Sequence, residues 1–270
     1  MEQRRMDYHL HTLHSMDGRQ SMEELCSDMV RRGVQEICLT EHIEPGHPRQ
    51  ELDIPPIWDV WFHELEAMRS RFPQLTIRAG VEIGDNPLLR ETIKRGLDDQ
   101  PYDFRLLSLH LVNGVDCYDI EQYFGGKTRA QAYREYAEAK AESILNWTEF
   151  DSVAHIGYAA KYSAYTGDDQ PLRYEDAPDA FDAILRHIIH LDKCLEINTS
   201  GYTKMTDALP HTSIVKRYIE LGGECFTFGS DSHDTDRNYM DVERAKEHVR
   251  SLGGKYQAAF CRRKKILYRI

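Results

Sequence analysis

Three histidines and two aspartates fall within the twelve-residue segment DYHLHTLHSMDG, which spans residues 7–18. His9 and His11 are two positions apart, and alternate side chains of a β-strand share one face, so both imidazoles would point the same way. Imidazole is the side chain that most often binds metal ions in proteins. The pair therefore predicts one corner of a metal site, if other parts of the chain bring further ligands to it.

Short β-like runs alternate with longer amphipathic segments, which is typical of parallel strands joined by crossover helices. Seven strand–helix units are predicted, one fewer than in the standard α/β barrel. Ser21 and Glu24 have the spacing of a capping box at the start of the first helix, and Gly33 stands where that helix should stop. The predicted strands are 6–12, 36–42, 76–84, 104–112, 152–157, 194–200 and 225–233, and the further predicted helices are 58–72, 87–97, 129–146, 176–190, 211–221 and 239–252.

The predicted strands all end in residues that could bind a metal. In an α/β barrel the carboxyl ends of the strands meet at one rim, where the active site lies. Six of the thirteen histidines fall at these ends, together with carboxylates. The sequence therefore predicts a metal cluster assembled from the whole barrel. The residues at the strand ends, in chain order, are His9, His11, His42, Glu82, His110, His155, Glu196, Asn198, Asp231 and His233.

Composition limits the class of protein. The chain has 270 residues, which fits one barrel domain spanning 1–270, and its formal charge of −11 argues against nucleic acid as the main partner. No apolar stretch reaches the roughly 20 residues that cross a bilayer, and MEQRRMDYH lacks the apolar core of a signal peptide. We therefore expect a cytoplasmic protein with no membrane partner.

Two groups of residues are interpreted as structural. The six cysteines contain no CxxC pair and fall mostly in apolar runs, so they are expected to be reduced core residues. The basic run 262–265 is interpreted as a solvated flank before the last apolar segment. Core or surface roles are expected for the histidines outside the strand ends, namely His47, His63, His187, His190, His211 and His248.

The motifs DYHLHT, TEH, GVEIG, SLH, AHIG and GSDSH resemble, in order and spacing, those of the polymerase-and-histidinol-phosphatase (PHP) superfamily. The chain length and the segment EINTSG at 196–201 are similar to the stand-alone histidinol-phosphatase branch. The resemblance implies a distorted seven-stranded (β/α)7 TIM-like barrel with three divalent metal ions. Nitrogen and carboxylate ligands without thiolate suit zinc, manganese or iron, and the sequence does not choose among them.

The resemblance also implies how nine ligands are shared among the three ions, with Glu82 bridging the first two. The implied sets are His9, His11, Glu82 and Asp231 for one ion, Glu82, His110 and His155 for the second, and Asp17, His42 and His233 for the third.

The expected reaction is hydrolysis of a small phosphomonoester, foremost L-histidinol phosphate, by in-line attack of a metal-bound hydroxide. Divalent ions would give the rim an excess of positive charge, which favours an anionic substrate despite the acidic surface. Asp231 and His233 are the candidates for handling protons, although both are expected to act mainly as ligands. Lys161, where the family usually has a basic residue and often arginine, and Lys204 are the candidate phosphate contacts.

Several alternatives stay open. The substrate could instead be another phosphoester, such as a sugar phosphate, a nucleotide or a phosphodiester, hydrolysed with the same metals. An alternative from a different functional class is a non-catalytic module that the metals stabilise. The oligomeric state is not predicted. The substrate's amine needs an acidic partner, for which the sequence offers Glu41, Glu44, Asp85 and Asp116. Whether His14, Glu41 and Glu44 join the site is also left open.

Overall fold

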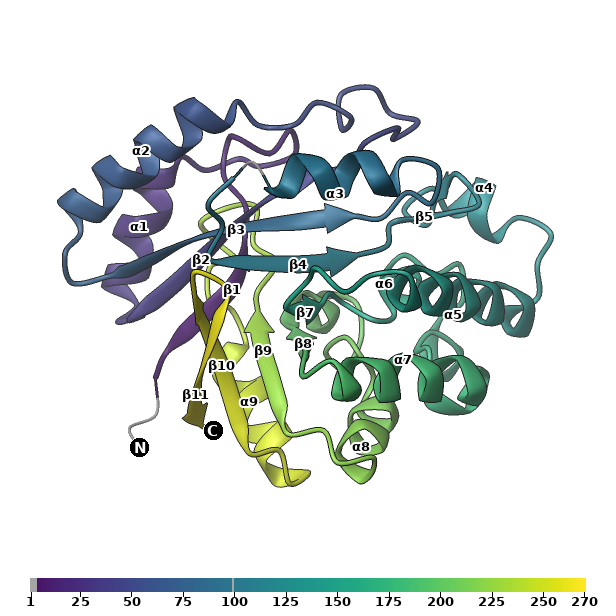
Figure 1. Ribbon diagram of the computed structural model, residues 1–270. Coiled ribbons are helices and arrows are strands. Elements are labelled where there is room, and N and C mark those ends of the chain that lie inside the picture. The colour runs from purple at the N-terminus through teal and green to yellow at the C-terminus, as the bar shows by residue number, and fades with distance from the viewer. Residues whose placement is uncertain (1–3, 99) are drawn as a thin grey trace.

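The computed structural model describes residues 4–98 and 100–270, and its centre is a barrel of parallel strands surrounded by helices (Figure 1). Hydrogen-bonded neighbours follow the order β1-β2-β3-β4-β7-β8-β9, and every pair is parallel. All seven predicted strands are present, which confirms the expected barrel class. They are β1 (Met6–Leu10), β2 (Glu36–Ile43), β3 (Thr76–Gly84), β4 (Phe104–Ser108), β7 (Ser152–Val153), β8 (Cys194–Asn198) and β9 (Cys225–Gly229).

The barrel closes between its first and last strands through residues just beyond β1 and β9. The amide of His11 donates to the carbonyl of Ser232 at 2.9 Å, and the amide of Asp231 donates to the carbonyl of His9 at 2.9 Å. Leu10 and Ser232 form a parallel bridge at the same place. The closing contacts therefore lie at the carboxyl-terminal rim, within the segments that carry the predicted ligands.

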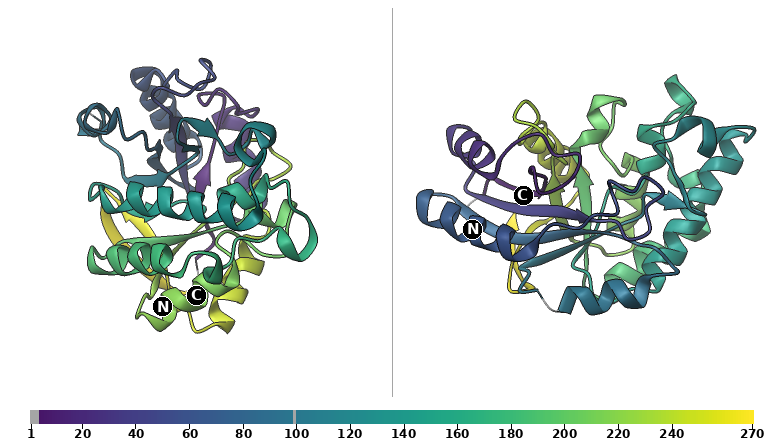
Figure 2. Two further views of the ribbon diagram at one scale, coloured as in Figure 1. Left: turned by 90° about the vertical axis from the view of Figure 1, so that its right-hand side faces the viewer. Right: turned by 90° about the horizontal axis from the view of Figure 1, so that it is seen from above.

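Helices cover the outside of the barrel, as two further views show (Figure 2). The capping box predicted for the first helix is formed, because Ser21 Oγ accepts from the Glu24 amide and Glu24 accepts from the Ser21 amide. The long helices lie within a few residues of their predicted ranges. They are α1 (Met22–Arg31), α2 (Trp58–Arg71), α3 (Arg90–Asp98), α5 (Arg129–Leu145), α7 (Pro178–His190), α8 (Thr212–Glu220) and α9 (Val242–Ser251).

Shorter elements lie in the loops of the rim. The predicted strand 104–112 ends at Ser108 and is followed by a small antiparallel hairpin, so its last residues turn away from the barrel. These elements bring loop side chains over the carboxyl ends of the strands. They are β5 (Leu111–Val112), β6 (Val115–Asp116), α4 (Ile120–Phe124), α6 (Tyr158–Lys161) and the 3₁₀ turns Gly167–Asp169, Tyr174–Asp176 and Thr199–Thr203.

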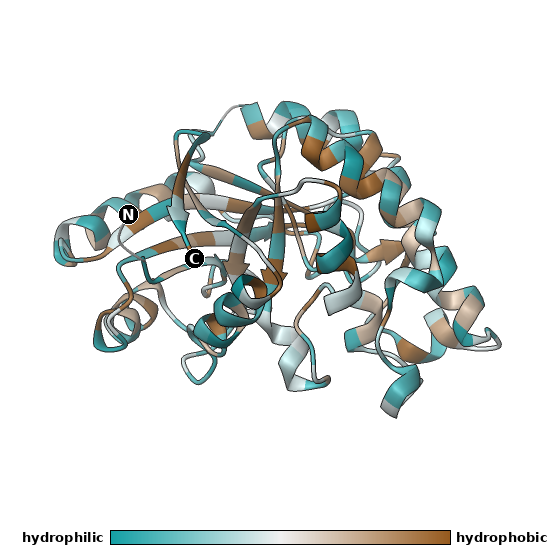
Figure 3. Cartoon of the chain, turned by 90° about the horizontal axis from the view of Figure 1, so that it is seen from below, coloured by the Kyte–Doolittle hydropathy of each residue, from teal (hydrophilic) through white to brown (hydrophobic). Residues whose placement is uncertain are grey.

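Two apolar layers hold the fold together. A large core lies between strands and helices, and Figure 3 shows hydrophobic strands in the middle with hydrophilic outward faces on the helices. A smaller cluster includes Met6, Tyr8 and Phe104, which are fully or almost fully buried.

A C-terminal hairpin, β10 (Tyr256–Cys261) and β11 (Lys264–Arg269), was not predicted. β10 pairs with the start of β9, and the amide of Phe260 donates to the hydroxyl of Tyr8 at 2.8 Å. The hairpin therefore closes the amino-terminal end of the barrel. Because Arg263 forms an ion pair with the buried carboxylate of Asp151, the interpretation of 262–265 as a solvated flank is wrong for that residue.

Cys194 and Cys225 form a disulfide, which corrects the expectation that all six cysteines are reduced. They begin the neighbouring strands β8 and β9, and the strand register places their Cα atoms 5.0 Å apart, within the range that a disulfide spans. Cys26, Cys38 and Cys117 are buried free thiols, as expected. In the part of the chain that the structure describes, no helix is both long and apolar enough to cross a membrane.

Candidate metal centre

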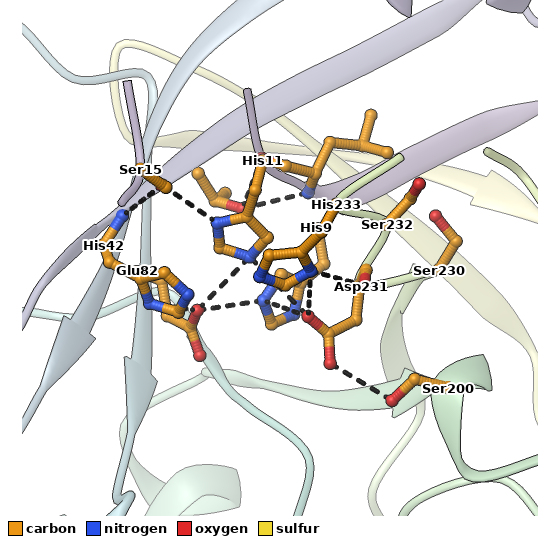
Figure 4. A network of polar contacts seen from close by, with 12 residues as sticks. His9, His11, Ser15, His42, Glu82, Ser200, Ser230, Asp231, Ser232 and His233 are labelled. Carbon is orange, nitrogen blue, oxygen red and sulfur yellow. Dashed lines mark hydrogen bonds and ion pairs between the residues drawn. The ribbon is translucent and has the colours of Figure 1, made fainter. Parts of the chain in front are cut away.

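The structure brings all nine predicted ligands together at the carboxyl-terminal rim. In Figure 4 the side chains of His9, His11, His42, Glu82, Asp231 and His233 point toward a common centre. Four overlapping triplets have one ligand atom each within 4.8 Å of the others. The triplets are His11, His42 and His233; His9, His11 and Asp231; His9, Glu82 and His155; and His42, Glu82 and His110.

Glu82, at the end of β3, faces two sets of histidines with its two oxygens. Its Oε2 lies 3.1 Å from His9 Nε2 and 3.5 Å from His11 Nε2. Its Oε1 lies 2.8 Å from His155 Nε2 and 3.4 Å from His110 Nε2. The two oxygens of Glu82 thus face the histidines of the first two predicted ligand sets.

The first set is completed by Asp231, which follows β9. Asp231 Oδ1 lies 3.5 Å from His9 Nε2 and 3.6 Å from His11 Nε2. Its other oxygen, Oδ2, accepts a hydrogen bond from Ser200 Oγ at 3.1 Å and lies 3.5 Å from Lys161 Nζ. The carboxylate is therefore fixed from one side, and Oδ1 is directed at the two histidines.

The third set is more open. Asp17 Oδ2 lies 3.3 Å from His233 Nε2, and Asp17 Oδ1 lies 3.7 Å from His42 Nε2. His42 also reaches the first two sets, because its Nδ1 lies 3.0 Å from Glu82 Oε2. The three sets thus form one continuous cluster. The ring of His42 links the open third set, through Asp17, to the buried first two sets, through Glu82.

Two carboxylates behind the cluster orient its imidazoles. Glu196 Oε1 lies 2.6 Å from His9 Nδ1, and its Oε2 accepts from the amide of His155 at 2.7 Å. Glu44 Oε1 lies 2.7 Å from His110 Nδ1. A partner on one ring nitrogen turns the other nitrogen toward the site and raises its basicity. Glu44, for which the sequence left a role at the site open, therefore lies beside the cluster and holds one of its imidazoles.

Burial and charge act against each other at the cluster. Burial opposes the charged imidazole of His9, but Glu196, Glu82 and Asp231 outweigh it and raise the pKa of His9 well above its ordinary value. Burial likewise opposes the carboxylate of Glu82, yet the surrounding histidines hold the pKa of Glu82 well below its ordinary value. The site thus keeps its carboxylates ionised.

The surroundings of the His11 ring show whether these residues fit a metal ion. Its side chain is buried, and its Nε2 has no hydrogen-bond partner among the described residues, although it faces Glu82 and Asp231. Burial and the neighbouring His233 and His42 lower the pKa of His11 well below its ordinary value, which favours the neutral ring. A neutral imidazole with a free lone pair is the form that binds a metal ion, so the donor set fits divalent metals.

Other acidic and histidine side chains near the rim have different partners. His14 Nε2 pairs with Glu64 at 2.8 Å, which directs it away from the cluster. Glu41 accepts hydrogen bonds from Thr12 and Ser15, and Ser15 Oγ lies 3.3 Å from His11 Nδ1, so Glu41 supports the loop that carries His11.

Two adjoining spaces open at the rim. The inner cavity has a volume of about 80 Å³, and the outer hollow has about 1200 Å³. Arg49, Asp116 and Tyr162 line both spaces. The inner cavity is lined by the ligands Asp17, His42, Glu82, His110, His155, Asp231 and His233, and by Glu44, His47, Leu52, Tyr158 and Lys161.

The two predicted phosphate contacts are separated. Lys161 lines the inner cavity, where its Nζ donates to Ser200 Oγ at 2.8 Å, whereas Lys204 lies on the outer hollow. His47 was expected in the core or on the surface, but it lines the inner cavity and its Nε2 lies 3.4 Å from Asp116 Oδ2. The only signal for His47 in the sequence is its position in the loop after a ligand-bearing strand.

Comparisons with known proteins agree with this geometry. Residues 7–200 match the family described as PHP domain. The chain is 26% identical over 260 residues to the histidinol-phosphatase of Lactococcus lactis, covering 95% of this chain and 94% of that protein. It is 33% identical over 239 residues to a protein of Clostridium acetobutylicum named "probable histidinol-phosphatase", covering 88% and 90% of the two chains.

A solved structure has the same fold along its length. It is the Lactococcus lactis histidinol phosphate phosphatase complexed with zinc, L-histidinol and phosphate, which superposes with a TM-score of 0.88 at 26% identity and covers 97% of this chain and 99% of that chain. Because the family match spans well over half of the residues, this chain belongs to the PHP domain family.

Proposed function

We propose that this protein is a metal-dependent phosphatase that hydrolyses L-histidinol phosphate to L-histidinol and phosphate. One observation carries the proposal: nine nitrogen and oxygen ligands converge at the rim of a barrel that superposes on an enzyme solved with zinc, L-histidinol and phosphate. The whole chain, 1–270, would act as one domain, since its C-terminal hairpin continues the sheet of the barrel.

The proposed cofactors are three divalent ions at the three ligand sets, and zinc, manganese and iron all suit this donor set. Bound there, such ions supply activated water at neutral pH and neutralise charge on the phosphoryl oxygens. Glu82 would hold two of the sets at a fixed separation, because its two oxygens face different histidines. Glu44 and Glu196 would keep His110 and His9 turned toward the site.

The chain's own residues would bind phosphate and move protons. Lys161, fixed by Ser200 and Asp231, presents its ammonium group to the inner cavity and would contact the phosphate. Asp231 and His233 line the same cavity and are the proposed groups for proton transfer at the nucleophile or leaving group, besides their role as ligands. Lys204 would act only on groups that extend into the outer hollow.

Asp116 is the proposed partner of the substrate's amine. Of the four acidic candidates, Asp85 is held by Arg90 and Trp147, and Glu41 by the loop around Thr12. Glu44 and Asp116 both line the inner cavity and both have partners there: Glu44 holds His110, and Asp116 pairs with Arg49 and His47. Asp116 lies where the two spaces meet, which suits the part of the substrate next to the phosphoester.

The decisive experiment measures phosphate release from L-histidinol phosphate beside a panel of sugar phosphates, nucleotides and a phosphodiester. Protein stripped with a chelator is assayed alone and after addition of Zn²⁺, Mn²⁺ or Fe²⁺. We expect metal-dependent turnover with kcat/KM of order 10⁴ M⁻¹s⁻¹ or above for L-histidinol phosphate. Preference for another ester would show that L-histidinol phosphate is not the substrate. Inactivity of the metal-loaded protein toward every ester would support a non-catalytic module.

Metal content gives a second test that does not depend on turnover. We expect elemental analysis to find three ions per chain, and the variant Asp17→Asn to retain about two, because Asp17 belongs only to the open third set. The variant Glu64→Gln, which alters a carboxylate paired with His14 outside the cluster, is the matched control and should retain three.

A further inference from the structure

Ser15, in the loop between β1 and α1, contacts two of the predicted ligands with one hydroxyl group (Figure 4). Its Oγ lies 3.3 Å from His11 Nδ1 and accepts a hydrogen bond from the amide of His42 at 3.1 Å. His11 belongs to the first ligand set, and His42 belongs to the third. Because Ser15 is buried, both contacts are shielded from solvent.

The partner of the His11 ring differs in kind from the partners of the other ligand rings. His9 and His110 have carboxylates at Nδ1, and His233 has the backbone carbonyl of Asp231 there, at 3.1 Å. Carboxylates and carbonyls accept hydrogen bonds, which places a proton on Nδ1 of each of these rings. A hydroxyl both donates and accepts, so it does not by itself determine which nitrogen of His11 carries the proton.

The carboxylate of Glu41, on β2, removes this ambiguity. Ser15 Oγ lies 2.6 Å from Glu41 Oε2. Glu41 also accepts a hydrogen bond at Oε2 from the amide of Thr12, at 3.1 Å, and one at Oε1 from the indole of Trp61, at 3.3 Å. Both oxygens thus face groups that can only donate. The carboxylate is therefore the acceptor, and the hydroxyl of Ser15 donates to it.

The hydroxyl proton directed at Glu41 leaves the oxygen of Ser15 only an accepting role toward its other neighbours. The amide of His42 is one donor, and the Nδ1–H group of His11 is the other. With its proton on Nδ1, the ring of His11 has its lone pair on Nε2. That nitrogen is buried, has no hydrogen-bond partner in the described part of the chain and lies 3.5 Å from Glu82 Oε2.

We propose that Ser15 is a positioning residue that holds His11 in its metal-binding tautomer, with Glu41 orienting the Ser15 hydroxyl. The inference rests on the proposed function, since it takes the ligand sets to hold metal ions. Nδ1 partners of ligand histidines fix the tautomer and the direction of the ring in this way. Because the same hydroxyl holds the backbone of His42, it also ties the loop after β1 to the end of β2.

The turn that carries Ser15 does not depend on the hydroxyl. The amide of Ser15 donates to the carbonyl of Thr12, and the amide of Gly18 donates to the carbonyl of Ser15, both at 3.0 Å. Ser15→Ala keeps these backbone hydrogen bonds and every ligand side chain. We therefore expect the variant to fold and to show the effect of the missing hydroxyl on His11.

Thr12→Val is the matched control for Ser15→Ala. Thr12 is also buried, and its hydroxyl donates to Glu41 at 2.6 Å, but its other hydrogen bond comes from the amide of His14 and not from a ligand ring. We expect Ser15→Ala to weaken zinc binding about ten-fold or more, because loss of a partner behind a ligand typically costs about 10–100-fold in metal affinity. Thr12→Val should keep the wild-type affinity. Competition with a chromophoric chelator measures both.

Nitrogen-15 NMR of zinc-loaded protein with labelled histidine shows the tautomer directly. In the wild type we expect the proton of His11 on Nδ1 and zinc on Nε2. In Ser15→Ala the Nδ1 proton should lose its protection from exchange with solvent. Ser15→Thr, which keeps the hydroxyl, should retain this protection and the zinc affinity.

These measurements do not depend on turnover, so the inference and the proposed function can fail separately. A loss of zinc affinity in Ser15→Ala alone supports the inference even if L-histidinol phosphate is not hydrolysed. Zinc on Nδ1 of His11, unchanged affinity in Ser15→Ala, or equal losses in Ser15→Ala and Thr12→Val overturns it while leaving phosphatase activity intact. The wild-type spectrum still decides if Ser15→Ala misfolds, because it needs no variant.

Discussion

Lys140 on α5 is a buried cation that the proposed reaction does not use. Its side chain is fully buried, and its Nζ has no hydrogen-bond partner among residues 4–98 and 100–270. Burial lowers the pKa of Lys140 from 10.5 to about 8, although Glu82, Glu196 and Asp85 act in the opposite direction. The folded protein therefore holds this proton less tightly than the unfolded chain does.

This difference predicts how stability depends on pH. Because the folded pKa is depressed, the cost of burying the charge is fully present below about pH 8 and disappears as the pH rises toward 10.5. We expect Lys140→Met to raise the free energy of unfolding by about 1–3 kcal/mol at pH 7 and by much less at pH 10. Urea unfolding at both pH values measures this, and an equal gain at both would contradict the electrostatic cause.

Lys161 and Lys204 give a paired test of phosphate contact. We expect Lys161→Ala to raise KM for the phosphoester at least about ten-fold, because loss of a charged hydrogen-bond donor to an anion costs about 1.5–3 kcal/mol. Lys204→Ala, on the outer hollow, should change KM less than three-fold. Steady-state kinetics measure both, and an unchanged KM for Lys161→Ala would remove that residue from the phosphate site.

At the residue scale, sequence reasoning succeeded where strand ends decide position. His9, His42, Glu82, His110 and His155 could be placed together because parallel strands deliver their carboxyl ends to one rim. Residues on the loops could not be placed in this way. The positions of Glu44 and His47 depend on how the loop folds back over the barrel, and spacing along the chain does not determine that path.

At the scale of elements, the position of the β10–β11 hairpin predicts that loss of one of its ion pairs lowers stability without changing catalysis. Arg263 pairs with the buried carboxylate of Asp151 at the end of the barrel opposite the site. We expect Arg263→Ala to lower the free energy of unfolding by about 2 kcal/mol, less than for a fully buried pair because Arg263 is partly exposed. Its kcat/KM should stay at the wild-type value at 20 °C.

Arg262→Ala is the matched control, since Arg262 occupies the same turn with an exposed side chain. Thermal and urea unfolding of the two variants measure the contribution of the ion pair. Equal destabilisation by both would mean that the turn, and not the ion pair with Asp151, is responsible.

The hairpin also shows why some elements escape prediction. A two-residue hairpin turn normally uses Asn-Gly or Asp-Gly, because both central residues need positive φ. Here Arg262 and Arg263 have φ values of 48° and 63°, so the turn lacks its usual sequence signal. The seven strands and long helices were predictable because their apolar pattern and caps agree with the burial seen in the fold.

At the scale of the whole molecule, the net charge of the chain and the local charge of the rim predict opposite effects of ionic strength on kcat/KM. The chain carries −11 overall, which would repel a phosphoester, whereas a metal-loaded rim would attract it. The screening length is about 30 Å at 0.01 M salt and about 10 Å at 0.1 M, so salt weakens whichever field dominates. The substrate binds at the rim, so the positive charge there should outweigh the more distant acidic surface. We therefore expect kcat/KM to fall several-fold between 10 and 200 mM salt, because salt weakens this attraction.

Kinetics in KCl and in tetramethylammonium chloride measure this dependence, and equal slopes in the two salts attribute it to screening. A rise of kcat/KM with salt would show that the acidic surface governs the encounter.

The closure of the barrel between β1 and β9 has a consequence during synthesis of the chain. The amide of Asp231 donates to the carbonyl of His9, and both residues belong to one predicted ligand set, yet more than 200 residues separate them. At about 5–20 residues per second, a ribosome makes Asp231 roughly 10–45 s after His9. The nascent protein therefore presents His9 and His11 without Asp231 for many seconds. Pairing of the last barrel strand with β1 then closes the barrel and completes this ligand set at the same time.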